Sequence, residues 1–191
     1  TGNNEGFSPI GNSTTYFSGT YDGAGYTING LTIMRSNTNQ IGLFGFANGA
    51  TIRNLGLTND NITGNQMIGS LVGLAFVSST IDNCSSSGTV TGTRVVGGLV
   101  GYPYSSTIRN SYSTATANGG SGAYIGGLAG FVYSSTILNS YSTGSVVASH
   151  TSRGGLVGRK SGISTTTDSF YDLETSGQSD TGKGTGKTTA E

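Results

Sequence analysis

Three acidic residues near the C-terminal end of the chain are the group whose types and spacing come closest to acid–base chemistry. Asp168, Asp172 and Glu174 lie close together, beside Tyr171. Neighbouring carboxylates can act on a glycosidic bond or hold a metal ion. No Arg or His accompanies them, and such a group is more typical of a solvated edge. We therefore expect no catalytic residue and no metal site, with a polysaccharide-degrading enzyme that uses these acids as the alternative.

The single cysteine is the second candidate for chemistry. Cys84 takes the place that Leu55, Ser111 and Ser140 hold in neighbouring repeats, and the single histidine, His150, falls in a different part of its repeat. A thiolate nucleophile needs a base beside it. A buried and unreactive side chain is therefore expected at Cys84, and no cofactor is expected.

Aromatic residues at recurring positions are the candidate ligand-binding surface. Tyr112, Tyr141 and Phe170 each stand two residues after an Asn or Asp, and a second set follows the glycine-rich motifs. A register in which Leu55 and Leu57 point inward turns the first set toward solvent, whereas a slip of one residue would bury it. Outward rings would suit sugars or a partner surface. The candidate ligand-binding residues are Tyr102, Tyr104, Tyr112, Phe131, Tyr133, Tyr141 and Phe170.

Hydroxyl side chains also recur, as Ser79-Thr80, Ser106-Thr107 and Ser135-Thr136, with Thr51 in the same place earlier. Regular hydroxyl rows on a flat surface could bind ice. The same residues also form hydrogen bonds at turns and between strands. One Thr in each repeat is a weak pattern for ice, so an ice-binding protein is the second alternative.

These residues are placed by a sequence repeat whose centre is Val96-Gly97-Gly98-Leu99-Val100-Gly101. Related motifs centre on four other leucines, and successive leucines are 28, 28, 29 and 28 residues apart. A second motif, of the form Ser-Thr-Ile-x-Asn, keeps the same period. A fixed period in this range indicates a repeat architecture. The five motif leucines are Leu43, Leu71, Leu99, Leu128 and Leu156.

Each repeat predicts one coil of a parallel β-solenoid. Frequent Gly and β-branched residues disfavour helix, and each repeat holds about three short apolar runs bounded by Gly, Asn or Ser. The predicted fold is all-β and right-handed, with about 28 residues in each coil. Stacked coils place the motif leucines in one buried row and the isoleucines in another, with an Asn row at a turn. The predicted isoleucine row contains Ile28, Ile52, Ile81, Ile108 and Ile137.

The repeats run without a Pro- or Gly-Ser-rich linker, which predicts one domain over residues 1–174. Residues 1–25 are expected to cap the array and residues 26–172 to form the repeats. Residues 175–191 have no large apolar side chain, so a surface tail or linker with little regular structure is expected there.

Composition excludes two classes of partner. The formal net charge is zero and only 9% of residues are charged, so there is no basic surface for nucleic acid. No apolar run is long enough for a membrane helix, so no membrane insertion is expected.

The motif Gly98-Leu99-Val100-Gly101 and its copies resemble the GLUG-motif repeat family, over nearly the whole chain. The segments 17–28, 170–177 and 184–191 resemble those that flank such repeats. In that family the repeats occur in large secreted or surface-anchored proteins of bacteria and archaea, outside any catalytic domain. The resemblance implies an extracellular β-helix and carries over no catalytic residue.

The sequence therefore predicts a non-enzymatic structural or adhesive module of a larger extracellular or cell-surface protein. Its expected partners are glycans, a host or neighbouring cell surface, or further copies stacked end to end through unpaired strand edges.

Overall fold

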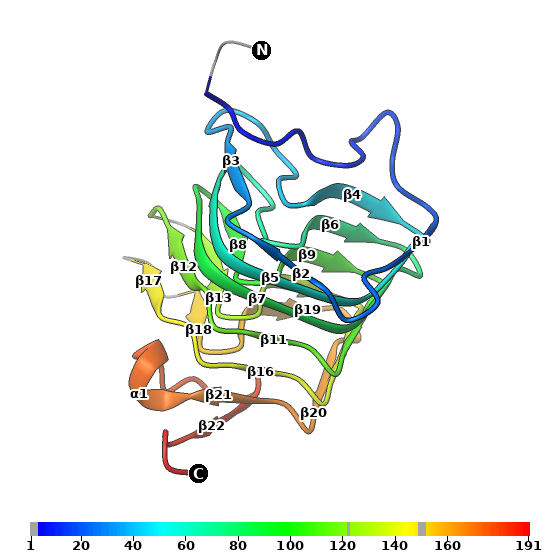
Figure 1. Ribbon diagram of the computed structural model, residues 1–191. Helices are drawn as coiled ribbons and strands as arrows, with labels where there is room; N and C mark the ends of the chain where they lie inside the picture. The colour runs from blue at the N-terminus through cyan, green and yellow to red at the C-terminus, as the bar shows by residue number, and fades with distance from the viewer. Residues whose placement is uncertain (1–3, 122, 149–151) are drawn as a thin grey trace.

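The chain folds into a parallel β-solenoid whose coils stack from the N-terminal to the C-terminal end (Figure 1). The computed structural model describes residues 4–121, 123–148 and 152–191. Every ladder between its named strands is parallel. Hydrogen-bonded residues of adjacent coils are typically 27–29 positions apart. The predicted all-β parallel solenoid and its coil length are confirmed.

Each complete coil contributes to three sheets. The 14-stranded sheet forms two sides of the coil and contains β1 (Thr20–Asp22), β2 (Thr27–Asn29), β3 (Thr32–Met34), β5 (Thr51–Thr63), β7 (Thr80–Gly92), β10 (Thr107–Arg109), β11 (Tyr112–Ser113), β12 (Thr116–Gly119), β15 (Thr136–Leu138), β16 (Tyr141–Ser142), β17 (Val146–Ala148), β20 (Thr165–Thr167), β21 (Phe170–Asp172) and β22 (Thr185–Lys187). The five-stranded sheet contains β4 (Phe44–Asn48), β6 (Val72–Phe76), β9 (Val100–Tyr104), β14 (Ala129–Tyr133) and β19 (Val157–Ser161). The three-stranded sheet contains β8 (Val95–Gly97), β13 (Tyr124–Gly126) and β18 (Arg153–Gly154). A single-turn helix, α1 (Leu173–Ser176), follows β21.

Two apolar rows run along the interior. Ile52, Ile81, Ile108 and Ile137 pair in register and are fully buried. The motif leucines form the other row, in which each leucine N–H from residue 71 to residue 128 bonds to the leucine carbonyl of the next coil. The buried motif leucines are Leu43, Leu71, Leu99, Leu128 and Leu156.

Ile28 does not belong to the isoleucine row, which is a correction to the sequence prediction. It pairs with Leu57, and Tyr21 stands beside Ile52 instead. The first coil has a short β1 before β2, so the Thr-Ile of residues 27–28 falls one strand later than in the other coils. The Thr-Ile pair of residues 27–28 therefore occupies a different position in its coil from the Thr-Ile pairs of later coils.

Left-handed residues form one corner of each coil. Asn54, Asn83, Asn110 and Asn139 have φ between 47° and 55°, and Asp168 continues them at 46°. Asn tolerates this backbone better than most residues because its short amide can bond locally. Asn83 Nδ2 donates to Asn54 Oδ1 at 2.9 Å, and Asn139 Nδ2 to Asn110 Oδ1 at 3.4 Å. The predicted Asn row is present at a turn.

Buried serines satisfy backbone groups beside the corners. Ser111 Oγ accepts from Cys84 N at 3.1 Å and donates to Arg109 O at 2.7 Å, and Ser140 repeats the pattern one coil later. Ser106 and Ser135 form a similar row at the corner that follows the five-stranded sheet. Buried backbone groups need such partners, so these hydroxyls hold adjacent coils together.

The C-terminal segment packs on the last coil, contrary to the expected surface tail. Tyr171 Oη donates to Asp180 O at 2.6 Å, and Gly155 N donates to Asp180 Oδ1 at 2.9 Å. Lys183 Nζ donates to Arg153 O at 2.7 Å, and β22 pairs with β21. The final coil supplies backbone donors, acceptors and an edge that these polar residues can meet without large apolar side chains.

Truncation after Ser179 is therefore expected to lower the melting temperature by about 5–10 °C. Such a loss corresponds to roughly 2–3 kcal/mol in a chain of this size. Thermal unfolding followed by circular dichroism measures the change. A chain that ends at Lys187 is the control and should melt close to the full chain, because it keeps β22. Equal melting of the full chain and the chain ending at Ser179 would contradict a capping role.

Candidate functional site

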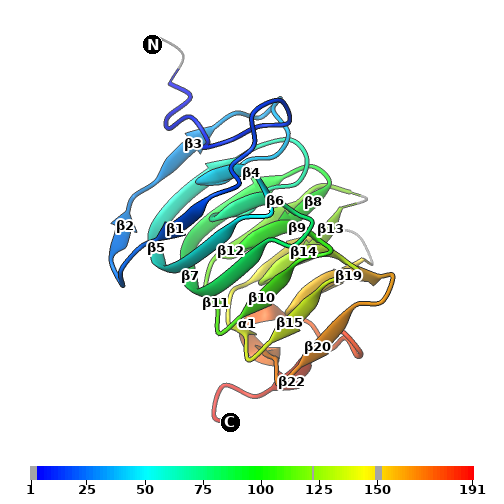
Figure 2. The same cartoon turned by 90° about the vertical axis from the view of Figure 1, so that its right-hand side faces the viewer.

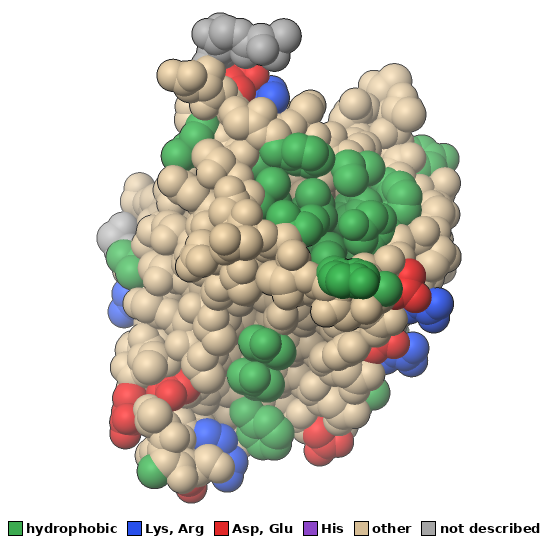
Figure 3. All heavy atoms as spheres, viewed as in Figure 1, with side chains coloured by type: hydrophobic (Ala, Val, Ile, Leu, Met, Phe, Trp, Pro, Cys, Tyr) green, Lys and Arg blue, Asp and Glu red, His purple; other side chains and the backbone are tan. Residues whose placement is uncertain are grey.

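Tyr112, Tyr141 and Phe170 form an exposed row, here called the aromatic stripe. They pair in register across β11, β16 and β21. Their side-chain neighbours Ser113 and Ser142 point inward, so alternation places the rings outside, with 37%, 42% and 39% of each residue exposed. Figure 3 shows hydrophobic side chains in a short column over these strands.

The two tyrosines of the stripe stack on each other. Their ring centroids are 4.9 Å apart and their planes differ by 2°. One face of each ring is therefore turned toward the other ring. Burial, with a smaller effect of Tyr112, raises the pKa of Tyr141, so this phenol stays neutral at physiological pH. The stripe offers apolar ring surface and phenol hydroxyls to a ligand.

The other aromatic candidates lie on the outer face of the five-stranded sheet and are only partly exposed. Tyr102 stacks on Phe131 at 5.0 Å, and Tyr104 stacks on Tyr133 at 4.9 Å. The two stacks also meet edge to face, at 6.0 Å between Tyr102 and Tyr104. These rings mainly cover one another, so the aromatic stripe is the better candidate for a ligand.

Arg159 closes this second aromatic group at its C-terminal side, which the sequence analysis missed. Its guanidinium carbon lies 5.0 Å from the ring centroid of Tyr124 and 5.7 Å from that of Phe131. It also donates to Tyr124 Oη at 2.8 Å. Arg159 takes the place of Phe131 in the next coil, so a cation–π contact continues the row where the aromatic residues stop.

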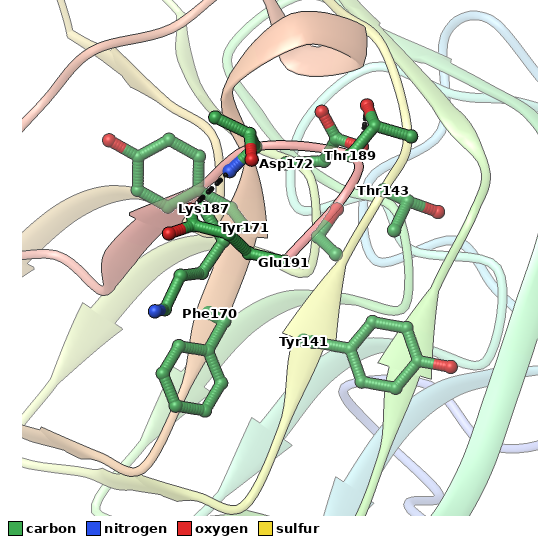
Figure 4. A pocket seen from close by; sticks show the side chains of 10 residues that line it. Tyr141, Thr143, Phe170, Tyr171, Asp172, Lys187, Thr189 and Glu191 are labelled. Carbon is green, nitrogen blue, oxygen red and sulfur yellow. Dashed lines mark hydrogen bonds between the residues drawn. The ribbon is translucent and has the colours of Figure 1, made fainter.

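A hollow of about 360 Å³ opens at the C-terminal end of the stripe (Figure 4). Tyr141 and Phe170 line one side of it, and Lys187, Thr189 and Glu191 of the last segment line the other. Because that segment packs on the last coil, a part of the chain expected to be a tail or linker contributes four of the ten residues that line this hollow.

The three acids Asp168, Asp172 and Glu174 have different surroundings. Asp172 caps α1, where Oδ1 accepts from Glu174 N at 2.8 Å and from Thr175 N at 3.0 Å. Its Oδ2 accepts from Thr189 Oγ1 at 2.8 Å, and these hydrogen bonds lower the pKa of Asp172. Asp168 occupies the exposed left-handed corner, and Glu174 is exposed on α1.

A metal site is not formed by the residues that the structure describes, among which no three His, Cys, Asp or Glu side chains gather. Cys84 is buried, and burial raises the pKa of its thiol to about 11. Its Sγ contacts Asp82 O at 3.3 Å. The thiol is therefore protonated at neutral pH and a poor nucleophile. His150 lies outside the described residues.

Asp60 is a buried acid that the sequence analysis missed. The ladder between β5 and β7 shifts register between Leu57 and Asp60, next to the left-handed Asn59. The shift turns Asp60 inward. Neither carboxylate oxygen makes a hydrogen bond of good geometry among the described residues, and burial, offset only in part by the nearby Ser70 hydroxyl, raises the pKa of Asp60 to about 7. The alternation of Asp60 with Ile62 is the sequence signal that could have found it.

The threonines form a longer row than expected. Thr51, Thr80, Thr107 and Thr136 pair in register, and Thr20 and Thr165 extend the row at its two ends. Figure 2 shows β10, β15 and β20 side by side on this face. The accompanying Ser79, Ser106 and Ser135 are buried and bond to backbone groups. The coils of β5, β7, β10 and β15 therefore present a single hydroxyl here, beside Arg53, Asp82, Arg109 or Leu138, and the last coil presents Thr165 and Thr167.

Comparison with known proteins gives matches over parts of the chain. The family described as the GLUG motif matches residues 64–91, 92–118 and 121–147. Halomucin of Haloquadratum walsbyi is 44% identical over 86 residues, which are 44% of this chain and 1% of that protein. A candidate Gly-rich membrane protein of Evansella cellulosilytica is 40% identical over 84 residues, which are 42% of this chain and 10% of that protein.

A solved structure shares the fold. It is a candidate immunoglobulin A1 protease from Bacteroides ovatus, with a TM-score of 0.72 and 23% identity, over 87% of this chain and 68% of that one. At this identity the likeness concerns the fold alone. The described residues contain no helix with the length and hydropathy to cross a bilayer. Residues 64–147 carry three tandem GLUG motifs, as the sequence predicts.

Proposed function

We propose that the chain is a non-catalytic structural and adhesive module of a larger protein, exposed at the cell surface or secreted. The aromatic stripe carries this proposal, because a rigid solenoid holds three exposed rings in register on successive coils. Aromatic side chains on a rigid scaffold bind partners at low entropic cost. Two similar proteins support a surface location, because one is a halomucin and the other is named as a Gly-rich membrane protein.

The arrangement of the acids favours a non-catalytic role over an enzyme. Both oxygens of Asp172 are already engaged by α1 and Thr189, so this carboxylate serves the local structure. A glycosidase needs two carboxyl groups that face one bond. The carboxylate of Asp172 instead stabilises the end of the solenoid.

The edge of β20 supports stacking of copies end to end. β20 ends the order of its sheet and is largely exposed, whereas Lys183 of the C-terminal segment contacts β18 and β19, and an exposed edge can pair with another strand. At the opposite end, Ile28 and Tyr21 only partly cover the core, and Figure 3 shows hydrophobic side chains gathered there. Light scattering on concentrated protein tests this part of the proposal, and a strictly monomeric solution would exclude it.

Tyr141→Ala is expected to weaken binding to glycans at least tenfold, because it removes the middle ring of the stripe. A glycan array probed with the purified chain measures the loss. Tyr16→Ala is the matched control, since Tyr16 is 48% exposed on the N-terminal segment and packs on Phe46 instead. Equal signals from both variants, or an array with no signal, would contradict binding through the stripe.

The same glycans should remain intact after incubation with the protein. Product analysis by mass spectrometry tests this. Cleavage that disappears in Asp172→Asn would establish the enzyme alternative.

A further inference from the structure

A hollow of about 200 Å³ lies at the N-terminal end of the aromatic stripe, opposite the end where the hollow of Figure 4 opens. One outward row of the 14-stranded sheet runs through Thr27, Gly56, Ser85 and then Tyr112. Three small residues therefore precede the first large ring. The step in side-chain size produces the hollow.

The ring of Tyr112 has one covered face and one open face. Tyr141 stacks on the first. The neighbour on the other side is Ser85, whose side chain is too short to cover a ring. The open face of Tyr112 borders the hollow, together with Gly56, which has no side chain to fill the space.

Free polar groups surround this open face. Asn83 donates its amide to Asn54 Oδ1 at 2.9 Å. Its own Oδ1 is unused by the described residues, as are the hydroxyls of Ser85 and Thr27. Within the part of the chain that the structure describes, no charged side chain lines the hollow. The site thus offers a flat apolar face beside neutral acceptors and donors.

We propose that this hollow binds one neutral pyranose ring, and the inference rests on the glycan-binding function proposed above. A pyranose has an apolar face of C–H groups, which can pack on the open face of Tyr112, and a rim of hydroxyls, which can bond to Asn83, Ser85 and Thr27. The volume is below the roughly 300–1,000 Å³ of pockets for drug-sized ligands. A single ring therefore fits better than an oligosaccharide.

The test is titration of the isotope-labelled chain with methyl glucopyranoside, galactopyranoside and mannopyranoside, followed by NMR. At least one should produce saturable shifts at the amides of Gly56, Asn83 and Ser85 at millimolar concentration. Methyl glucuronide should bind no more tightly than the neutral sugars, because the described lining offers no cation to its carboxylate. Absence of saturable shifts at these amides with every neutral sugar would overturn the inference.

Two variants assign the binding to the hollow. Ser85→Tyr extends the aromatic row by one ring and fills the space, so affinity should fall at least tenfold. Tyr112→Leu keeps an apolar side chain but removes the ring face, so its affinity for the sugar should fall by a similar factor. Ser85→Ala leaves the space open, so it should lose less affinity than Ser85→Tyr or Tyr112→Leu. Unchanged affinity in Ser85→Tyr and Tyr112→Leu would overturn the assignment, and a well-dispersed NMR spectrum confirms that each variant is folded.

The outcome separates the two proposals. A glycan array signal lost in Tyr141→Ala, together with no response to the methyl glycosides, keeps the stripe and rejects the hollow. A response to methyl glycosides with no array signal supports the hollow and rejects adhesion through the stripe.

Discussion

Gly126→Ala is expected to destabilise the solenoid by more than about 4 kcal/mol, which is exceptional for a single substitution. Gly126 belongs to the glycine-rich motif of the fourth leucine. A Cβ at this position would overlap the carbonyl oxygen of Ala129 and lie 2.6 Å from Gly158 N. Both atoms are backbone, in the same coil and the next, so neither can move away as a flexible side chain would. Relief would require the backbone between residues 126 and 129 to change its conformation and the next coil to move away.

Gly120→Ala is the matched control for Gly126→Ala. Gly120 is exposed, and the nearest atom to its added Cβ, Thr93 O, is 3.5 Å away. It should melt within a few degrees of the parent, whereas Gly126→Ala should melt far lower or fail to fold. Thermal unfolding by circular dichroism compares them. Similar melting of the two variants would show that close approach of coils does not explain the glycines of the motif.

Asp60→Asn is expected to stabilise the chain above pH 7 and to flatten its pH dependence. The pKa of Asp60 rises from 3.8 to about 7 on folding because the carboxylate loses water without gaining a strong partner. Between these values the folded chain holds a proton that the unfolded chain releases. Stability therefore falls as pH rises from about 4 to about 7, by up to roughly 4 kcal/mol.

Urea unfolding at several pH values between 4 and 8 measures this effect. The carboxylates whose pKa is lowered, such as Asp82 and Asp22 beside their Arg and Asn partners, act in the opposite direction and below about pH 4. The difference between the parent and Asp60→Asn cancels the other titrating groups. Parallel curves for the two chains would mean that Asp60 is ionised without cost in the folded state.

The central coils could be predicted because stacking repeats one environment. The period of the leucines and isoleucines places like residues above like, and a left-handed corner selects Asn in each coil. The direction of the stripe also follows from alternation, once Ser111 and Ser113 are known to point inward. Comparison of equivalent positions in successive coils thus indicates which side chains face the interior, which the sequence of a single short strand does not.

The ends and the irregular positions could not be predicted by the same argument. Ile28 has the same sequence neighbours as the isoleucine row, but in the first coil β1 takes the place of the isoleucine strand and Ile28 lies in the strand that follows. The segment that contains Asp180 and Lys183 docks through backbone hydrogen bonds, which leave no apolar pattern in the sequence. Asp60 turns inward through a register shift, and the hollow beside Tyr112 depends on small residues that resemble ordinary strand positions.

The serine rows bear on how the molecule responds to tension. Their hydrogen bonds, like those of the strand ladders, link each coil to the next and therefore point along the axis of the stack. The chain also enters at one end of the stack and leaves at the other (Figure 1). A force applied through the two ends would cross every interface, but it would concentrate on the few bonds next to each point of attachment in the outermost coils, whereas each inner coil shares it over all of its contacts with its neighbours. The module would then lengthen in steps, one coil of about 28 residues at a time, and limit the force passed to whatever it is attached to.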